Sequence, residues 1–132
     1  MNVMRWDCKG GTNCFNLKKR VKLGVFDNCF PGKIGMGDVD GIVEINGRAL
    51  VLEWKADQIP LPRGQAIMWH RLTKSGIFTV LCIAGDAETM AVDAIQWCCY
   101  GKWDSDWKKS SLSDVQDWMR RWVTEVAMMT NG

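Results

Sequence analysis

Runs and stripes of hydrophobic residues along this chain predict strands and helices in alternation. Residues 39–45 are rich in β-branched side chains, and residues 48–55 form an apolar run with a polar end. Asn46-Gly47 lies between the two runs. Asn-Gly in this setting is the strongest short-range hairpin signal, because a type I′ turn needs a positive φ at both positions. The pattern therefore predicts a two-stranded antiparallel hairpin.

A helix is expected next, over 64–75. It follows a proline-containing loop over 59–63 and stops at Gly76 in the left-handed αL conformation. The spacing i, i+3, i+4, i+7 predicts one helical face made of Gln65, Met68, Trp69 and Leu72.

Two strands are predicted after this helix. The unbroken apolar run 77–83 is typical of a buried central strand. Residues 91–100 predict a further strand that ends at Gly101, with a helix over 88–94 as the alternative. A turn at Gly85-Asp86 separates the two strands.

The last predicted element is a helix over 113–128, capped by Ser111 or Ser113. Its apolar residues repeat on one face at Val115, Trp118, Trp122 and Val126. The order strand, strand, helix, strand, strand, helix predicts an α/β fold with a mixed central sheet flanked by helices.

The segment 1–37 is glycine-rich and weakly periodic. A short helix over 16–23 with Gly24 as its stop is expected, and residues 27–37 are expected to form a loop. A length of 132 residues fits one domain. We divide it into a lead-in over 1–37, a core over 38–100 and a C-terminal helix region over 101–132.

The charge of the chain is uneven. The formal net charge is only +2, but between Lys9 and Lys33 the one acidic residue is Asp27. This basic lead-in could contact nucleic-acid phosphates, or it could be a solvated face. The residues assigned to nucleic-acid binding are Lys18, Lys19, Arg20, Lys22 and Lys33.

Neither an N-terminal apolar run nor a stretch of about 18 apolar residues is present, so a soluble, intracellular protein is expected. In that setting cysteines are reduced thiols rather than disulfides. A zinc site made by Cys8, Cys14, Cys29 and His70 is an alternative, although these spacings match no compact zinc motif.

The end of the second predicted strand carries candidate chemistry. Glu53 and Lys55 are two residues apart, so both point to one face, while Leu50, Leu52 and Trp54 point to the other and can pack on a core. A buried charged pair is costly unless it is solvated or has a function.

The Asn46-Gly47 turn fixes the register of the hairpin, and counting outward places Asp40 opposite Glu53 and Asp38 opposite Lys55. Opposed residues have Cβ atoms about 4.5–5.5 Å apart, so the two carboxylates would repel unless a cation neutralised them. Oxygen ligands suit Mg²⁺ or Mn²⁺. Asp38 is an alternative or supporting ligand.

Eight tryptophans are unusual for this length. Those in the last third alternate with lysine and arginine, which suits base stacking with phosphate contact. Core packing is the alternative, which we favour for Trp118 and Trp122 and leave open for Trp103 and Trp107.

Asp38-Val39-Asp40-Gly41, a hairpin and then Glu53-Trp54-Lys55 resemble the PD-(D/E)xK nuclease superfamily. The following helix with Gln65, and then Gly76 before an apolar strand, are similar to its virus-type replication-repair nuclease (VRR-NUC) branch. The resemblance covers 37–83. The chain departs from the pattern in having Val39 where the family often has proline, and in lacking the upstream helical glutamate that some branches use.

The resemblance implies a restriction-endonuclease-like core and a DNA endonuclease that cleaves phosphodiester bonds with Mg²⁺ or Mn²⁺, in a bacterial or phage-infected cytoplasm. Asp40 and Glu53 would be the metal ligands, joined by Asp38 and the backbone carbonyl of Trp54. Lys55 would be the catalytic cation. Gln65 would support it, completing a catalytic set of Asp40, Glu53, Lys55 and Gln65. So small a core has little surface for recognising DNA, so a homodimer and structure-selective cutting are expected. One alternative is an enzyme that acts on RNA or on a special DNA structure. The other is a non-catalytic binding protein, such as an inhibitor of host defence.

Overall fold

The computed structural model describes residues 21–104 and 106–128. The chain forms two compact units, Met1–Asp38 and Val39–Gly132. In its described part the N-terminal unit has one short 3₁₀-helix, η1 (Leu23–Cys29), with no buried residue. Of the helix expected over 16–23, residues 16–20 lie outside the described part of the chain, and the expected stop at Gly24 is wrong because Gly24 lies inside η1. The predicted loop accordingly begins after Cys29. Without an apolar stripe to bury, this segment offered no periodic signal that could fix the helix bounds.

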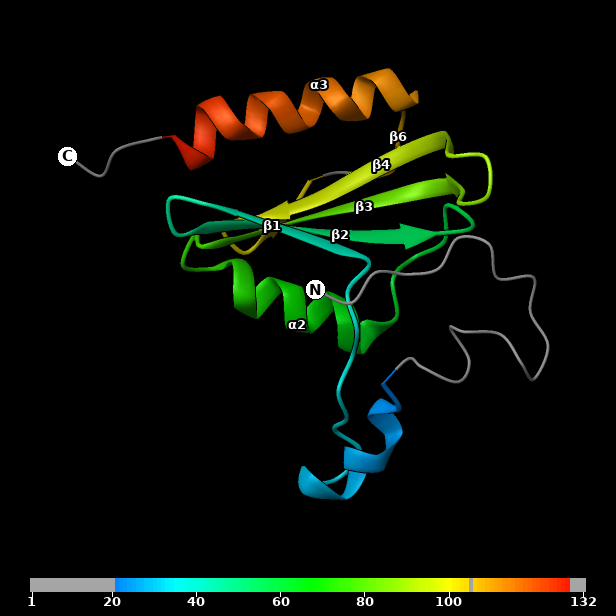
Figure 1. The fold of residues 1–132 in the computed structure, drawn as a ribbon, viewed down its shortest axis with the longest axis vertical. Coiled ribbons are helices and arrows are strands. Elements are labelled where there is room, and N and C mark those ends of the chain that lie inside the picture. Colours follow the sequence, from blue (N-terminus) through cyan, green and yellow to red (C-terminus); the bar gives the residue numbers. More distant parts are fainter. Residues whose placement is uncertain (1–20, 105, 129–132) are drawn as a thin grey trace. The chain divides into compact units, whose positions relative to one another are not determined.

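The C-terminal unit is an α/β structure in which helices cover both faces of a mixed six-stranded sheet (Figure 1). The strand order is β1-β2-β3-β4-β5, with β6 pairing to β4. Strands β2 and β3 are parallel and the other pairs are antiparallel. The elements are β1 (Gly41–Ile45), β2 (Arg48–Lys55), α2 (Arg63–Thr73), β3 (Phe78–Asp86), β4 (Ala91–Cys99), β5 (Lys102–Trp103), β6 (Lys108–Lys109), α3 (Leu112–Trp122) and a π-helical turn, η2 (Val123–Ala127).

The predicted hairpin is confirmed. Asn46 and Gly47 have φ of 54° and 83°, as the two central positions of a type I′ turn require. The strands pair from Ile45↔Arg48 to Gly41↔Leu52, which is the register obtained by counting from the turn.

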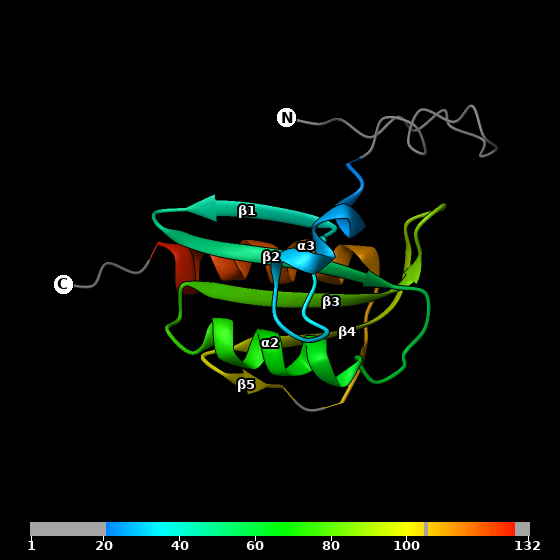
Figure 2. The same ribbon diagram turned by 90° about the horizontal axis from the view of Figure 1, so that it is seen from below.

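Helix α2 connects the parallel strands β2 and β3, and Figure 2 shows it lying along the sheet on the side opposite α3. The sheet therefore has an apolar layer on each face. Leu50, Leu81 and Trp122 lie in the layer under α3, and Val51, Val80 and Trp69 lie in the layer under α2. Strand β3 is buried on both faces, as its unbroken apolar run predicted.

The face predicted for α2 is buried only in part, at Trp69. Met68 and Leu72 are 39% and 43% exposed, whereas Trp69 and Thr73 are buried. Thr73 tolerates burial because its hydroxyl donates to the Trp69 carbonyl oxygen at 2.6 Å and lies 3.2 Å from the Cys98 sulfur. A threonine whose hydroxyl is hydrogen-bonded within its own helix thus occupies the core position that the hydrophobic pattern assigned to Leu72.

The predicted C-terminal helix is confirmed in position and in its buried face. Ser111 accepts from the Asp114 amide and Asp114 accepts from the Ser111 amide, which forms a capping box. Val115 and Trp122 are buried, and the helix continues past Trp122 as the π-helical turn η2.

Strand β4 confirms the strand prediction for 91–100 over the helical alternative. Strands β5 and β6 were not predicted, since two residues are too few for an alternating pattern. Tyr100 and Gly101, with φ of 52° and 73°, form the tight turn from β4 into β5. None of the helices in the described residues is long and apolar enough to span a bilayer.

Candidate active site

The candidate site lies where β2 extends beyond its partner β1. Pairing with β1 ends at Gly41↔Leu52, whereas pairing with β3 continues to Lys55↔Ala84. The last three residues of β2, Glu53, Trp54 and Lys55, therefore have one edge not covered by the β1 ladder.

Asp40 occupies this edge. Its backbone N–H donates to the Leu52 carbonyl oxygen at 3.2 Å, and its carboxylate Oδ2 accepts from the Trp54 N–H at 2.6 Å. The β1–β2 ladder itself ends at Gly41↔Leu52, so these two bonds are what hold Asp40 beside the end of β2. The structure thus brings Asp40 beside the residues with which the hairpin count had grouped it. The charge-assisted bond to Trp54 fixes the carboxylate at this place.

Glu53 is the buried member of the group, with a side chain on the α2 side of the sheet and a residue exposure of 6%. It lies beside Cys82 in the parallel ladder. A buried carboxylate is costly unless it is paired, hydrogen-bonded or bound to a metal. The position is therefore suited to a functional carboxylate more than to a solvated strand end.

The pKa of Cys82 reflects both its burial and the charges of Glu53 and Lys55. Burial, and after it the negative charge of Glu53, raise the pKa of the Cys82 thiol from 9.0 to about 12, against the opposing positive charge of Lys55. The thiol is thus neutral at physiological pH and supplies neither a thiolate ligand nor a nucleophile. The chemistry of the site rests on its oxygen atoms and on Lys55.

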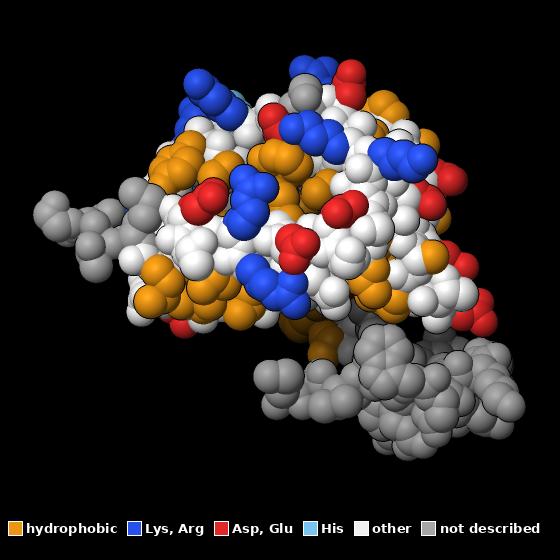
Figure 3. Space-filling view, turned by 90° about the horizontal axis from the view of Figure 1, so that it is seen from above, with side chains coloured by type: hydrophobic (Ala, Val, Ile, Leu, Met, Phe, Trp, Pro, Cys, Tyr) orange, Lys and Arg blue, Asp and Glu red, His pale blue; other side chains and the backbone are white. Residues whose placement is uncertain are grey.

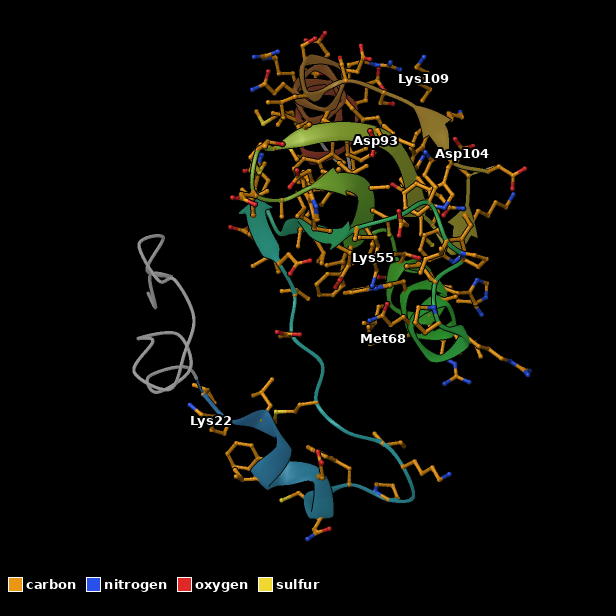
Figure 4. All side chains as sticks on the ribbon, turned by 90° about the vertical axis from the view of Figure 1, so that its right-hand side faces the viewer. Lys22, Lys55, Met68, Asp93, Asp104 and Lys109 are labelled. Atoms are coloured by element: carbon orange, nitrogen blue, oxygen red, sulfur yellow. The ribbon has the colours of Figure 1, made fainter. Side chains whose placement is uncertain are left out.

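Lys55 and Gln65 meet across the gap between β2 and α2. The Lys55 ammonium donates to Gln65 Oε1 at 3.0 Å, and Gln65 stands in the first turn of α2. Figure 4 shows Lys55 on the side of the sheet that faces α2. The amide oxygen holds the ammonium at the end of β2 without neutralising its charge, because an amide is uncharged.

Two carboxylates and one carbonyl are the candidate metal ligands. The N–H and C=O of one residue in a strand face the same edge, so the Trp54 carbonyl faces the edge where its N–H meets Asp40. In the described part of the chain no group of three or more His, Cys, Asp or Glu side chains could hold a metal ion. Mg²⁺ commonly uses one or two carboxylates and keeps several waters, so the donor set of Asp40, Glu53 and Trp54 fits such an ion.

The remaining predicted site residues belong to the N-terminal unit or lie outside the described residues. Asp38, Lys22 and Lys33 belong to the N-terminal unit, and both lysines are exposed. Lys18, Lys19 and Arg20 lie outside the described residues, as do Cys8 and Cys14 of the alternative zinc site. Of the other two residues of that alternative, Cys29 is exposed in the N-terminal unit and His70 is exposed on α2.

The tryptophans serve mainly in packing. Trp103 and Trp107 pack against the layer under α2, and the Trp103 indole donates to the Ala66 carbonyl oxygen at 3.4 Å. Under α3, the ring centroids of Trp97 and Trp118 are 5.6 Å apart, and the buried Trp122 donates to Thr79 Oγ1 at 3.1 Å. These contacts favour the core-packing interpretation over base stacking.

Sequence reasoning missed Cys82 and the Asp40–Trp54 hydrogen bond. The first depends on the parallel register between β2 and β3, for which no local signal exists. The Asp40–Trp54 hydrogen bond could have been predicted, because counting along the hairpin already placed Asp40 beside the end of β2.

Comparisons of this chain with protein-family models, with curated proteins and with solved structures found no match.

Proposed function

We propose that the C-terminal unit is a restriction-endonuclease-like core and that it acts as a divalent-metal-dependent DNA endonuclease of the VRR-NUC type. One observation carries the proposal: a buried glutamate, an amide-held aspartate and a glutamine-held lysine meet at the open end of β2. This is the grouping that the Asp, Glu-x-Lys and helical Gln pattern of the sequence predicts.

Asp40, Glu53 and the Trp54 carbonyl would hold Mg²⁺ or Mn²⁺, which supplies Lewis acidity toward a phosphate oxygen when bound. Asp38 remains the alternative ligand. The Trp54 N–H keeps Asp40 Oδ2 in one orientation, so the ligand is positioned before any cation arrives. Such preorganisation reduces the cost of assembling a site during the reaction.

Lys55 would place its positive charge next to the phosphate, where negative charge develops as the phosphodiester bond is attacked. Gln65 would position Lys55 through the 3.0 Å bond from Nζ to Oε1. Glu53 itself is buried, so water screens its charge less than that of an exposed carboxylate, because electrostatic interactions weaken with increasing local dielectric.

The direct test is a cleavage assay on plasmid, linear, single-stranded and branched DNA with Mg²⁺, Mn²⁺ or EDTA. The wild type should cut at least one of these substrates with a metal and none in EDTA. Glu53→Gln and Lys55→Ala should each lower cleavage by at least 10²-fold, since each removes a group on which metal or transition-state charge depends.

The matched control is Glu125→Gln, which changes an exposed residue of η2, the element that contacts the Asn46-Gly47 turn at the other end of β2, and should leave cleavage unchanged. Cleavage by Glu53→Gln at the wild-type rate would overturn the assignment. A wild type inactive on all four substrates would favour the non-catalytic alternative, a binding protein that keeps the fold.

A further inference from the structure

One stretch of the C-terminal unit is free of acidic residues. No aspartate or glutamate occurs from 58 to 85, whereas Arg63, Arg71 and Lys74 occur within it. All three are exposed, and all three lie on α2 or at its C-cap. In the described residues none of the three takes part in an ion pair.

These basic residues share one side of the helix. With 3.6 residues per turn, the side chains of Arg63, Arg71 and Lys74, together with His70, project within about 100° of one another around the helix axis. They point away from the buried side chains of Trp69 and Thr73. Arg63 and Lys74 are separated by about 16 Å along the helix axis, the length of roughly five base steps of a DNA strand. We call Arg63, His70, Arg71 and Lys74 the α2 basic stripe.

The opposite face of the sheet provides a contrast. On α3, Arg120 lies 2.7 Å from Asp117 and Arg121 lies 3.6 Å from Glu125, and beside it Lys108 lies 2.7 Å from Asp104. Figure 3 shows positive and negative side chains interspersed over this face. Its positive charge is therefore largely cancelled locally, whereas that of the α2 basic stripe is not.

The α2 basic stripe and the candidate site lie on the same side of the sheet. Gln65, which holds Lys55, stands in the first turn of α2 with Arg63, although the two side chains project about 160° apart around the helix. Both Glu53 and Lys55 also lie on the α2 side of the sheet. A polyanion bound along α2 would thus lie on the side of the sheet where the carboxylates and Lys55 meet.

We propose that the α2 basic stripe binds the sugar-phosphate backbone of duplex DNA on the side of the sheet that carries the site. The choice of DNA rests on the proposed function, while the preference for a polyanion rests on the unpaired charge. Each lysine or arginine that neutralises a phosphate releases counterions, which makes affinity fall as salt rises.

The test compares two full-length triple variants in binding titrations with a labelled duplex DNA in EDTA at several salt concentrations. Arg63→Gln, Arg71→Gln and Lys74→Gln together remove three charges from the stripe. Lys109→Gln, Arg120→Gln and Arg121→Gln together remove three from the opposite face and serve as the control. The slope of log Kd against log salt should fall by about 2–3 in the stripe variant, and the control should keep the wild-type slope.

Thermal melting verifies that both variants are folded, and Arg63→Gln alone, which should lower the slope by about 1, gives a second readout. Wild-type affinity and slope in the stripe variant, equal losses in both triple variants, or binding of duplex RNA but not DNA would each overturn the proposal. Salt-dependent DNA binding lost in the stripe variant, in a protein that never cleaves DNA, would support this surface and reject the nuclease.

Discussion

Three consecutive residues of β2 show how strand alternation divides labour at the candidate site. The Glu53 and Lys55 side chains point toward α2, where one is buried and the other meets Gln65. The Trp54 side chain points the other way, and its indole donates to the Gly85 carbonyl oxygen at 3.0 Å. The Trp54 backbone N–H meanwhile binds Asp40. The end of β2 thus directs a carboxylate and an ammonium group toward α2, an indole toward the opposite face of the sheet, and a backbone N–H toward Asp40.

The neutral state of Cys82 gives a prediction at this scale. Because burial and the Glu53 charge raise its pKa to about 12, iodoacetamide at pH 9 should leave Cys82 unmodified in the folded protein and modify the exposed Cys29. Peptide mapping by mass spectrometry measures both, and unfolding in urea should make both reactive. Equal rates of modification of Cys82 and Cys29 in the folded protein would contradict the buried environment that Cys82 shares with Glu53.

The same raised pKa fixes the sign of a stability effect. Between pH 9.0 and about 12 the unfolded chain loses the Cys82 proton while the folded chain keeps it, so this group makes the folded state less stable as pH rises.

Local signals explain which site residues could be predicted from the sequence. Asp40 and Glu53 are linked by one two-residue turn, so counting from Asn46-Gly47 was sufficient to bring Asp40 to the end of β2 that carries Glu53. Cys82 is joined to Glu53 only through a parallel ladder closed by the intervening helix. A non-local register of that kind has no signature in a single sequence.

The two helices differ in how well their sequences describe them. Helix α3 has a capping box and a wide apolar stripe, so its start and buried face were predictable. Helix α2 has neither a side-chain cap nor an acidic first turn, and it buries Thr73 in place of Leu72. Its polar core position is favourable only because Thr73 bonds to its own helix and to Cys98, which no hydrophobic pattern can reveal.

The capping box predicts a stability change that leaves the site intact. Ser111→Ala removes the acceptor for the Asp114 amide and should lower the free energy of unfolding by about 1 kcal/mol. Ser111→Asp keeps an acceptor at this position and should retain most of the stability. Urea denaturation of the three proteins gives the comparison, and an unchanged midpoint for Ser111→Ala would show that the cap contributes nothing.

At the scale of the whole C-terminal unit, a sheet covered on both faces leaves β2 open at one end. Helix α2 closes one face and α3 closes the other, while β1 stops at Gly41, short of Glu53. The α/β class and the mixed sheet were predictable from element order and the hairpin. The order of strands across the sheet was not, because strand pairing is decided by tertiary packing of elements far apart in sequence.

Metal-dependent thermal stability tests the central claim most directly. If Asp40 and Glu53 hold a divalent cation, Mn²⁺ at 100 times its Kd should stabilise the wild type by about 2.7 kcal/mol, which is on the order of 10 °C in Tm for a domain of this size. Asp40→Asn keeps an oxygen that can accept from the Trp54 N–H but loses the charge, so the fold should survive and the metal shift should vanish.

Lys55→Ala is the decisive comparison, because Lys55 is not a ligand. Its metal-induced rise in Tm should match that of the wild type even though its DNA cleavage is lost. Calorimetric melting of wild type, Asp40→Asn and Lys55→Ala, each with Mn²⁺ and with EDTA, therefore separates binding from catalysis. The account predicts a metal shift in the wild type and in Lys55→Ala and none in Asp40→Asn. A wild type whose Tm is the same in Mn²⁺ and in EDTA would contradict it.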